Sequence, residues 1–341
     1  MGEVVTIGLD IAKSVFQVHG IDAEGGVVLR RQLRRAHLLR FFAKQPACLI
    51  GIEACASAHH WGRELTKLGH QIRLMPPSYV KPYVKRQKND AADAEAICEA
   101  VTRPSMRFVE VKSDEQQSVM VLHRVRLILM RQRVQLSNAI RGHMAEFGIV
   151  APIGREGLRS LIRMIVGGDE RVPQQAQFCL QLLGKQLELI SRQILETDRQ
   201  IRASARATEI GRRLMDVPGV GPLLASALVA TIADPKAFRS GRNLAAWIGL
   251  VPRQSSSGGK ERLGGITKQG DRYLRQLLVV GALAVVRYAD RHGTRRPWLV
   301  QLLARRTTKV AAVALANKTA RIVWAMMVSG ESYREPVAQS T

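Results

Sequence analysis

The chain has 341 residues and carries 52 Lys and Arg against 28 Asp and Glu, which gives a formal net charge of +24 and a pI near 10.9. A surplus of this size predicts a polyanionic partner that is bound with strong salt dependence. A membrane partner is disfavoured, because the longest uninterrupted apolar run, residues 277–286, is too short to span a bilayer and is bracketed by arginines.

The N-terminus and the cysteines both indicate a cytoplasmic protein. The first residues enter a strand pattern directly, without the basic region of a secretion signal. Cysteines stand at four positions without CxxC spacing, which indicates reduced core residues and neither a zinc site nor a disulfide framework: Cys48, Cys55, Cys98 and Cys179. With 46% hydrophobic residues, a chain of this length can bury two cores.

Residues 1 to about 110 alternate between strand and helix patterns. Strands are expected at 4–9, 14–21, 26–33, 48–53 and 71–75, and helices near 37–45, 59–69 and 90–101. The run Asp22-Ala23-Glu24-Gly25-Gly26 predicts a hairpin between the second and third strands. A hairpin meander followed by strand–helix alternation predicts an α/β domain, with a mixed sheet and helices on its faces.

Four acidic residues stand in this region where their side chains can meet. Asp10 and Glu53 each close an apolar strand. Asp90 and Asp93 lie three residues apart on a predicted helix, so both point from one face. Converging carboxylates repel each other unless a cation lies between them, and Mg²⁺ suits such oxygen ligands, with Mn²⁺ as a substitute. Taken singly, Asp10 also fits a turn residue and Asp90 the partner of a helix dipole.

From residue 114 to about 147 the pattern becomes one long helix. It carries five arginines: Arg124, Arg126, Arg131, Arg133 and Arg141. Few acids lie nearby to pair with them, which favours a surface that faces nucleic acid over a helix that is only solvated and salt-bridged.

A Gly- and Pro-bearing stretch at 148–173 separates the two halves of the chain, and a heptad-like register follows it. Its positions are spaced alternately by three and four residues: Leu180, Leu183, Leu187, Ile190, Ile194, Thr197 and Ile201. About three heptads is the lower limit for a coiled coil, and the threonine weakens the register. We expect a dimerising helix pair here; the alternative is an amphipathic helix that packs on its own domain.

The last section, about 209–330, is mostly helical and contains two informative loops. The first is Val217-Pro218-Gly219-Val220-Gly221-Pro222, which precedes an apolar helix. It resembles the helix-hairpin-helix motif, in which Gly219 and Gly221 would let the backbone and the next helix N-terminus contact a DNA phosphate. Any helix–helix connection can use such a turn, so the basic character of the chain carries most of this prediction.

The second loop, residues 252–275, combines a Ser-Gly cluster with positive charge. Its six basic residues outnumber two acids, Glu261 and Asp271; they are Arg253, Lys260, Arg262, Lys268, Arg272 and Arg275. The cluster at 255–259 alone would suit a flexible linker. Cations around a hydroxyl would instead hold a phosphate, and a serine there could attack phosphorus and keep the cut strand covalently. No histidine lies nearby in the sequence to act as its base.

Six segments of the chain match one protein family in order. They are Ile7-Gly8-Leu9-Asp10-Ile11-Ala12-Lys13, Gly51-Ile52-Glu53-Ala54, Lys88-Asn89-Asp90-Ala91-Ala92-Asp93-Ala94, Val217-Pro218-Gly219-Val220-Gly221, the run from Leu244 to Arg253, and Ser-Gly-Gly-Lys to Gly-Asp-x-x-Leu-Arg. Over nearly its whole length the chain therefore resembles the DEDD-type insertion-sequence transposases related to the Piv invertase, which are bridge-RNA-guided serine recombinases.

The resemblance implies a fold, a cofactor and a reaction. The first half would have a RuvC-type fold of the ribonuclease H class, with Mg²⁺ bound by Asp10, Glu53, Asp90 and Asp93. A serine of the second half would cut DNA by transesterification to a phosphoserine and then religate it. A count back from the turn at 268–270 favours Ser256 as that serine, followed by Ser257 and then Ser255.

The resemblance also implies partners. A noncoding RNA would pair with target and donor DNA, and dimers of the chain would join into a tetramer. The expected division is a RuvC-like domain at 1–150 that ends in the long basic helix, a linker and coiled-coil-like helix at 151–208, a transposase domain at 209–330, and a tail at 331–341.

One departure from the family pattern follows the second acid. Many relatives place Gly two residues after the Glu-Ala pair, whereas this chain has Ala56 and then His59-His60-Trp61. A histidine beside an acid could be a metal ligand, but we interpret the pair as residues at the start of a helix.

Three other functions compete with recombination. A resolvase-like nuclease that uses water would need the acids and leave the basic Ser-Gly loop without a purpose. A non-catalytic RNA- or DNA-binding protein would explain the charge and leave the acids as coincidence. An actin-like sugar kinase also begins with a strand and hairpin, but this chain lacks the later Gly-rich adenosine site.

Overall fold

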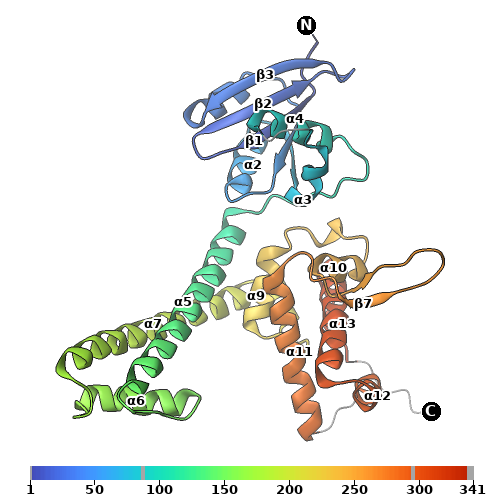
Figure 1. Cartoon of the computed structure of the whole chain (residues 1–341). Helices are drawn as coiled ribbons and strands as arrows, with labels where there is room; N and C mark the ends of the chain where they lie inside the picture. The colour runs from blue at the N-terminus through green and yellow to red at the C-terminus, as the bar shows by residue number, and fades with distance from the viewer. Residues whose placement is uncertain (1, 86–88, 293–295, 336–341) are drawn as a thin grey trace. The chain divides into compact units, whose positions relative to one another are not determined.

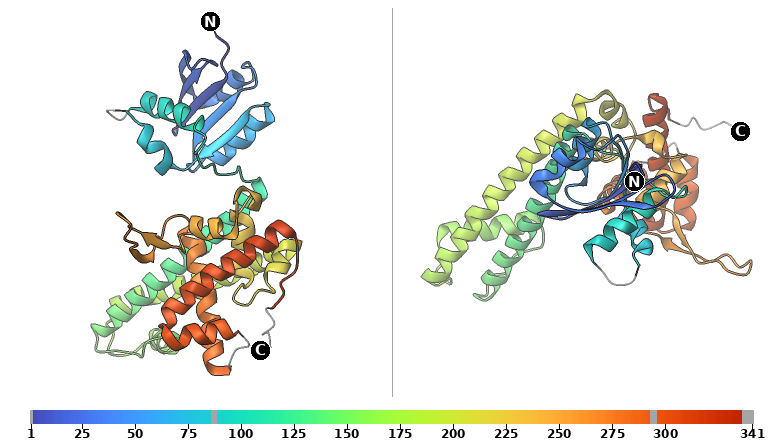
Figure 2. Two further views of the ribbon diagram at one scale, coloured as in Figure 1. Left: turned by 90° about the vertical axis from the view of Figure 1, so that its right-hand side faces the viewer. Right: turned by 90° about the horizontal axis from the view of Figure 1, so that it is seen from above.

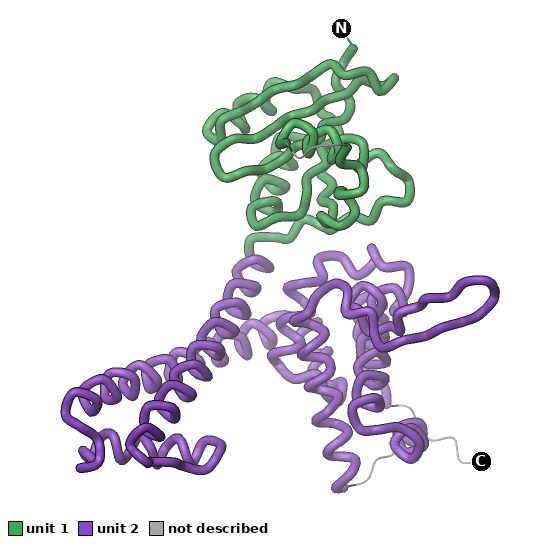
Figure 3. Tube along the Cα trace, in the orientation of Figure 1, with its two compact units in different colours: residues 1–114 green, residues 115–341 purple. Residues whose placement is uncertain are grey.

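The computed structural model of the protein describes residues 2–85, 89–292 and 296–335 (Figure 1). By its internal contacts the chain divides into two compact units, residues 1–114 and 115–341, which we call the N-terminal and C-terminal units (Figure 3). The long helix expected in the first domain therefore groups with the C-terminal unit. The expected division at residues 150, 208 and 330 stays a prediction, and the end of the expected tail, 336–341, lies outside the described residues.

The N-terminal unit is built on a five-stranded sheet with the order β3-β2-β1-β4-β5. The strands are β1 (Thr6–Ile11), β2 (Val15–Ile21), β3 (Val27–Arg34), β4 (Leu49–Glu53) and β5 (Gln71–Met75). The first three form an antiparallel meander, whereas β4 runs parallel to β1 and β5 parallel to β4. The expected mixed sheet is confirmed, and every expected strand in this unit is present within two residues.

Helices cover both faces of this sheet (Figures 1 and 2). They are α1 (Leu38–Phe42), α2 (Ala58–Lys67), α3 (Pro77–Val80) and α4 (Asp90–Val101). Alternate residues of a strand point to opposite faces. Ile7 and Leu9 of β1 belong to the buried cluster that also contains α1 and α2 residues. The residues between and after them, Gly8 and Asp10, therefore face α4, which packs on β1, β2 and β4.

The C-terminal unit is helical apart from one short hairpin. Its elements are α5 (Asp114–Ala145), α6 (Arg155–Gly167), α7 (Gln174–Ala207), α8 (Glu209–Leu214), α9 (Pro222–Thr231), α10 (Gly241–Ile248), β6 (Pro252–Gln254), β7 (Leu263–Ile266), α11 (Arg272–His292), α12 (Pro297–Arg305) and α13 (Thr308–Ser329). The predicted mostly helical second half is confirmed.

The separating stretch at 148–173 contains a helix that the sequence analysis did not predict. Helix α6 buries Leu161 and Ile165 in one cluster with the end of α5 and the start of α7. These residues are four apart, which is one helical turn, but glycines and a proline on either side of them hide the pattern. The stretch is therefore part of a packed helical arm and more than a linker.

The heptad register is used within the chain. Leu180, Leu187, Ile190, Ile194, Thr197 and Ile201 are all buried in the single chain, and α7 packs against α6, α8 and α9. The heptad positions of α7 thus form the buried face of an amphipathic helix that packs on its own domain. This burial disagrees with the expected helix pair between two copies along the same face. The physical reason is that apolar residues at intervals of three and four suit any helix partner.

The arginines of α5 serve different purposes. Arg126 forms a salt bridge with Asp198 of α7 at 2.5 Å. Arg141 donates hydrogen bonds to two backbone oxygens, of Ala151 and Gly154, both at 3.0 Å. Two of the five arginines therefore brace the helical arm, which weakens the prediction that this helix presents all of them to nucleic acid.

One helix, α13, is long and apolar enough to cross a membrane by length and composition alone. Eight of its residues are buried, and it packs against α10 and α11. Most of these buried residues, including Leu315 and Val323, belong to the main apolar cluster of the C-terminal unit. This packing is that of a core helix of the unit.

Candidate active site

The register of the sheet brings the first two acids to one end of it. Strands β1 and β4 are parallel neighbours, and Leu9 of β1 pairs with Ile52 of β4. The next residues along the two strands are Asp10 and Glu53, which therefore lie at the same level on the same face. Both side chains are half-buried.

Two glycines allow α4 to approach this face closely. A Cβ atom on Gly8 would lie 2.1 Å from the backbone oxygen of Ala94, and one on Gly51 would lie 2.7 Å from the Cβ of Val101. Any other side chain would push the helix away from the sheet. Sequence reasoning did not assign these residues a role, although each stands two positions before an acid, in Gly8-Leu9-Asp10 and Gly51-Ile52-Glu53.

The first turn of α4 supplies the other two acids. Asn89 caps the helix, because its side-chain oxygen accepts a hydrogen bond from the backbone N–H of Ala92 at 2.7 Å. The cap fixes where the helix begins and so where Asp90 and Asp93 lie. A carboxylate oxygen of each lies within 4.8 Å of the other and of one on Asp10. Lys88, which begins this matching segment, lies outside the described residues.

The electrostatics of the cluster favour a bound cation. The pKa of Asp10 is raised from 3.8 to about 6, chiefly by burial and then by the negative charges of Asp93, Asp90 and Glu53. The structure thus brings Asp10, Asp90 and Asp93 close enough to share one cation. The negative charge of the fourth predicted acid, Glu53, raises the pKa of Asp10. A set made only of carboxylate oxygens fits a hard divalent cation such as Mg²⁺ or Mn²⁺.

The two histidines after the second acid are not part of this cluster. His59 Nδ1 accepts a hydrogen bond from the backbone N–H of Lys112 at 3.1 Å. His60 packs edge-on against Trp61, with ring centroids 4.9 Å apart. Among the described residues, the group that could hold a metal contains acids alone, which agrees with the interpretation of these histidines as helix-start residues.

The Ser-Gly loop is an ordered hairpin. Strands β6 and β7 pair in antiparallel fashion, and the Ser255 N–H donates to the Arg262 oxygen at 3.0 Å. Ser257 pairs with Lys260 across a two-residue turn whose glycines, Gly258 and Gly259, have φ angles of 57° and 75°. Positive φ at both turn positions is typical of a tight type I′ turn. A flexible linker is therefore the wrong interpretation of this segment.

Among the three serines, Ser256 has a distinct contact. Its Oγ accepts a hydrogen bond from the backbone N–H of Arg262 at 3.2 Å, which turns the hydroxyl toward the opposite strand. The side chains of Arg253, Lys260 and Arg262 are exposed on the same hairpin. Figure 1 shows the hairpin projecting from the helices of its unit.

The base of the hairpin is held by backbone bonds and by one arginine. Thr267 N–H donates to the Val251 oxygen at 2.9 Å. Arg275 donates from one nitrogen to the oxygens of Ile248 and Gln269, at 2.7 and 2.9 Å. Of the six basic residues predicted to contact nucleic acid, Arg275 is thus engaged in bracing the loop, while Lys268 and Arg272 are exposed beside it.

The helix-hairpin-helix-like segment forms a turn between α8 and α9. A Cβ on Gly219 would lie 3.0 Å from the backbone oxygen of Gly281 in α11. Close packing against α11 is thus a sufficient reason for a glycine at position 219, and no contact with DNA is needed to explain it. Gly221 stands directly before α9 and caps its N-terminus; contact of either glycine with DNA stays a prediction.

Two protein-family models match this chain, one in each half. Residues 7–149 match a model described as a transposase, of the DEDD type of IS110 elements, and residues 211–296 match the transposase IS116/IS110/IS902 family.

Three relatives are similar over nearly their whole length. A probable family 20 transposase of Pseudomonas aeruginosa is 51% identical, over 96% of this chain and 98% of its own. The transposase for insertion sequence element IS1111A of Coxiella burnetii is 40% identical, over 98% and 92%. The transposase for element IS1328 of Yersinia enterocolitica is 39% identical, over 97% and 98%.

Proposed function

Because the chain belongs to the IS110 family of DEDD transposases, we propose that its acid cluster cuts DNA during transposition with the help of Mg²⁺. The family supports a DNA-cutting enzyme that uses a divalent metal. The observation that carries the choice of site is the meeting of Asp10, Asp90 and Asp93 within 4.8 Å. Mn²⁺ is the expected substitute.

Asp10, Asp90 and Asp93 would hold the ion, with Glu53 beside them. When bound, such an ion polarises a phosphate oxygen and stabilises the charge that develops on it. Burial and the neighbouring negative charges raise the pKa of Asp10 to about 6. Binding of a cation therefore releases a proton from this carboxyl at mildly acid pH, which makes metal affinity rise with pH.

We place the nucleophile at Ser256, with Ser257 second and Ser255 third. In this step the serine Oγ forms a bond to phosphorus, the bond between phosphorus and one sugar oxygen breaks, and that sugar leaves as a hydroxyl after taking up a proton. The serine proton passes to solvent. Attack by the freed or exchanged hydroxyl reverses the step and returns the serine, so no net bond energy is lost. The basic side chains of the hairpin support the developing phosphate charge.

A second mechanism uses water in place of serine. The acid cluster lies in a domain of the DEDD type, and a metal-bound carboxylate site can activate water without a serine. This alternative keeps every role given to the acids and assigns none to the hairpin. It predicts cut DNA that never becomes attached to protein.

The proposed partners are target and donor DNA, a noncoding guide RNA, and further copies of the chain, in the cytoplasm. The net charge of +24 supports polyanion binding. Because the heptad face is buried, we assign the dimer contact to exposed apolar residues on α5, spaced by four and three: Val121, Val125 and Ile128. Dimers would join into a tetramer around two DNA duplexes.

The test is a search for a covalent protein–DNA adduct. The protein, with its co-purifying RNA and Mg²⁺, is incubated with labelled DNA and run on a denaturing gel beside Ser256→Ala and Ser257→Ala. An adduct that is lost only in Ser256→Ala supports the serine mechanism and the register. Cut DNA without an adduct supports water as the nucleophile, and intact DNA with wild-type protein contradicts the proposed function.

A further inference from the structure

A pocket opens beside the acid cluster, on the same face of the sheet. Its volume is about 390 Å³, and β2, β3 and the first half of α4 line it. The pocket lies in line with the acids across the sheet. Asp10 of β1 pairs with Gln17 of β2, and Gln17 pairs with Gln32 of β3. Neighbouring strands lie about 4.8 Å apart, so the two glutamines are one and two strand spacings from Asp10.

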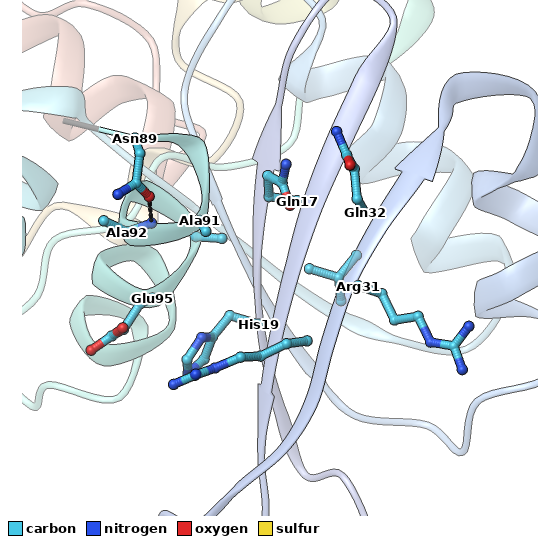
Figure 4. A pocket seen from close by; sticks show the side chains of 11 residues that line it. Gln17, His19, Arg31, Gln32, Asn89, Ala91, Ala92 and Glu95 are labelled. Atoms are coloured by element: carbon cyan, nitrogen blue, oxygen red, sulfur yellow. Dashed lines mark hydrogen bonds between the residues drawn. The ribbon is translucent and has the colours of Figure 1, made fainter.

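The pocket presents amide groups toward one space. Figure 4 shows Gln17 and Gln32 side by side on their strands, with Asn89 across from them on α4, whereas Arg31 points away from the helix. In the described part of the chain, neither glutamine side chain makes a hydrogen bond, and the Asn89 oxygen is used by its cap while its nitrogen is not. Amides that offer donors and acceptors together suit the edges of nucleic-acid bases.

His19 adds an imidazole to the polar groups that line the pocket. Three histidines of the described chain are buried, and the other two are satisfied. His70, which is 3% exposed, contacts Cys48 and the Phe42 oxygen, and His123, which is 1% exposed, contacts Tyr273 and Ser226. His19 is only 5% exposed and lines the pocket, yet its ring makes no hydrogen bond to any described residue. Its ring nitrogens are not sealed in the core, so they are open to hydrogen bonds with a ligand in the pocket.

The charges at the pocket favour a base over a bare phosphate. Lys85 and Glu95 form a salt bridge at 2.9 Å, and Arg30 is the other cation that acts on His19 among the described residues. Burial lowers the pKa of His19, so the ring is neutral and offers one donor and one acceptor. A nucleotide would place its base among the amides and the imidazole and its phosphate near Arg30.

We propose that this pocket is a nucleotide subsite, which takes one unstacked base of the DNA strand whose neighbouring phosphate lies at the acid cluster. The inference rests on the proposed function, since it needs a DNA strand at the acids. Holding one base out of the stack fixes the strand in register with the carboxylates. The residues that hold the base are Gln17, His19, Gln32 and Asn89.

Photo-cross-linking tests the subsite without requiring cleavage. The full chain is mixed with a short single-stranded DNA that carries one 4-thiothymidine, without divalent metal, irradiated and digested. We expect cross-links in the peptide that spans residues 15–34. Their yield should fall about tenfold in His19→Phe and in Gln32→Ala, as loss of a paired base contact implies. Gln71→Ala, the same change on an exposed residue of β5, should leave the yield unchanged.

The outcomes separate this proposal from the function on which it rests. Bound DNA without cross-links in 15–34, or yields that Gln32→Ala does not change, overturns the subsite and leaves the cutting site standing. Cross-links that persist in a protein that never cuts DNA support the subsite and contradict the function. Gln32 is exposed, so its substitution cannot act by unfolding the protein. A matching RNA with 4-thiouridine that cross-links in place of DNA overturns the assignment to DNA.

Discussion

The acid cluster and the serine hairpin are positioned in different ways. The acids are held by buried tertiary packing, since the register of two parallel strands brings Asp10 beside Glu53 and the close approach of α4 brings Asp90 and Asp93 to the same end of the sheet. The hairpin is held by local backbone hydrogen bonds and is exposed along its length. Changes near the acids should therefore disturb both fold and chemistry, whereas changes in the hairpin should affect chemistry alone.

The largest expected effect is the loss of DNA cutting on removal of an acid. Asp10→Ala should lower the cleavage rate by on the order of 10³-fold, because a ligand of the proposed metal is lost. The assay is cleavage of labelled DNA with Mg²⁺. The matched control is Glu99→Gln on α4, which removes a carboxylate that pairs with Arg103. Equal activity of Asp10→Ala and wild type would falsify the metal site.

A change to the packing under the acids should lower stability as well. Gly8→Ala forces α4 away from β1 and should cost about 1–3 kcal/mol or more in the free energy of unfolding, as overpacking does. Urea unfolding measures this loss. Gly142→Ala in α5, where a Cβ meets nothing within 4 Å, should instead stabilise by roughly 0.5–1 kcal/mol. Equal effects of the two substitutions would contradict the close packing of α4 on Gly8.

The pH dependence of the metal-free protein tests the electrostatics of the cluster. The folded pKa of Asp10 lies above its ordinary value, so the native state binds this proton more tightly, and stability falls as pH rises from 3.8 to about 6. The difference corresponds to about 3 kcal/mol at most, which solvent screening at a half-buried group reduces to about 1–2 kcal/mol.

Asp10→Asn removes this charge. At neutral pH it should therefore make the metal-free protein more stable by about 1–2 kcal/mol while abolishing cleavage. Thermal unfolding in a chelating buffer, at mildly acid and neutral pH, measures both the variant and the wild type. A variant that is less stable than wild type at neutral pH contradicts the electrostatic account.

The smallest expected effect on stability belongs to the hairpin. Ser256→Ala removes one exposed hydrogen bond, to the Arg262 N–H, and should change the free energy of unfolding by less than about 0.5 kcal/mol. Its effect on the covalent adduct should nevertheless be complete. If unfolding midpoints of Ser256→Ala and wild type differ by much more, the hairpin is coupled to the core and the two regions are not distinct.

The sequence allowed most of the N-terminal unit to be predicted, because its strands alternate cleanly with helices and because Asp10 and Glu53 each close an apolar run. Asp90 and Asp93 could be placed on one helix face from their spacing alone. The roles of Gly8 and Gly51 could not, since a glycine in a strand does not reveal which backbone approaches it. Nor could the pocket lined by Gln17 and Gln32, which depends on pairing between strands.

The C-terminal unit was harder to predict. Helix α6 is short and lies between segments rich in glycine and proline, which indicate a loop. The register of α7 looks the same whether its partner is another copy or its own chain. The Ser-Gly cluster resembled a linker because composition alone does not distinguish a mobile segment from one closed by a two-residue turn with positive φ.

Calorimetric titration of the metal-free protein with Mg²⁺ or Mn²⁺ is the direct test of a metal site at the acid cluster. At a pH near 6, in buffers of different ionisation enthalpy, we expect saturable binding accompanied by proton release from Asp10. Both should disappear in Asp10→Asn and remain in Glu99→Gln. Absence of saturable binding, or binding that Asp10→Asn leaves unchanged, would contradict a metal site at this end of the sheet.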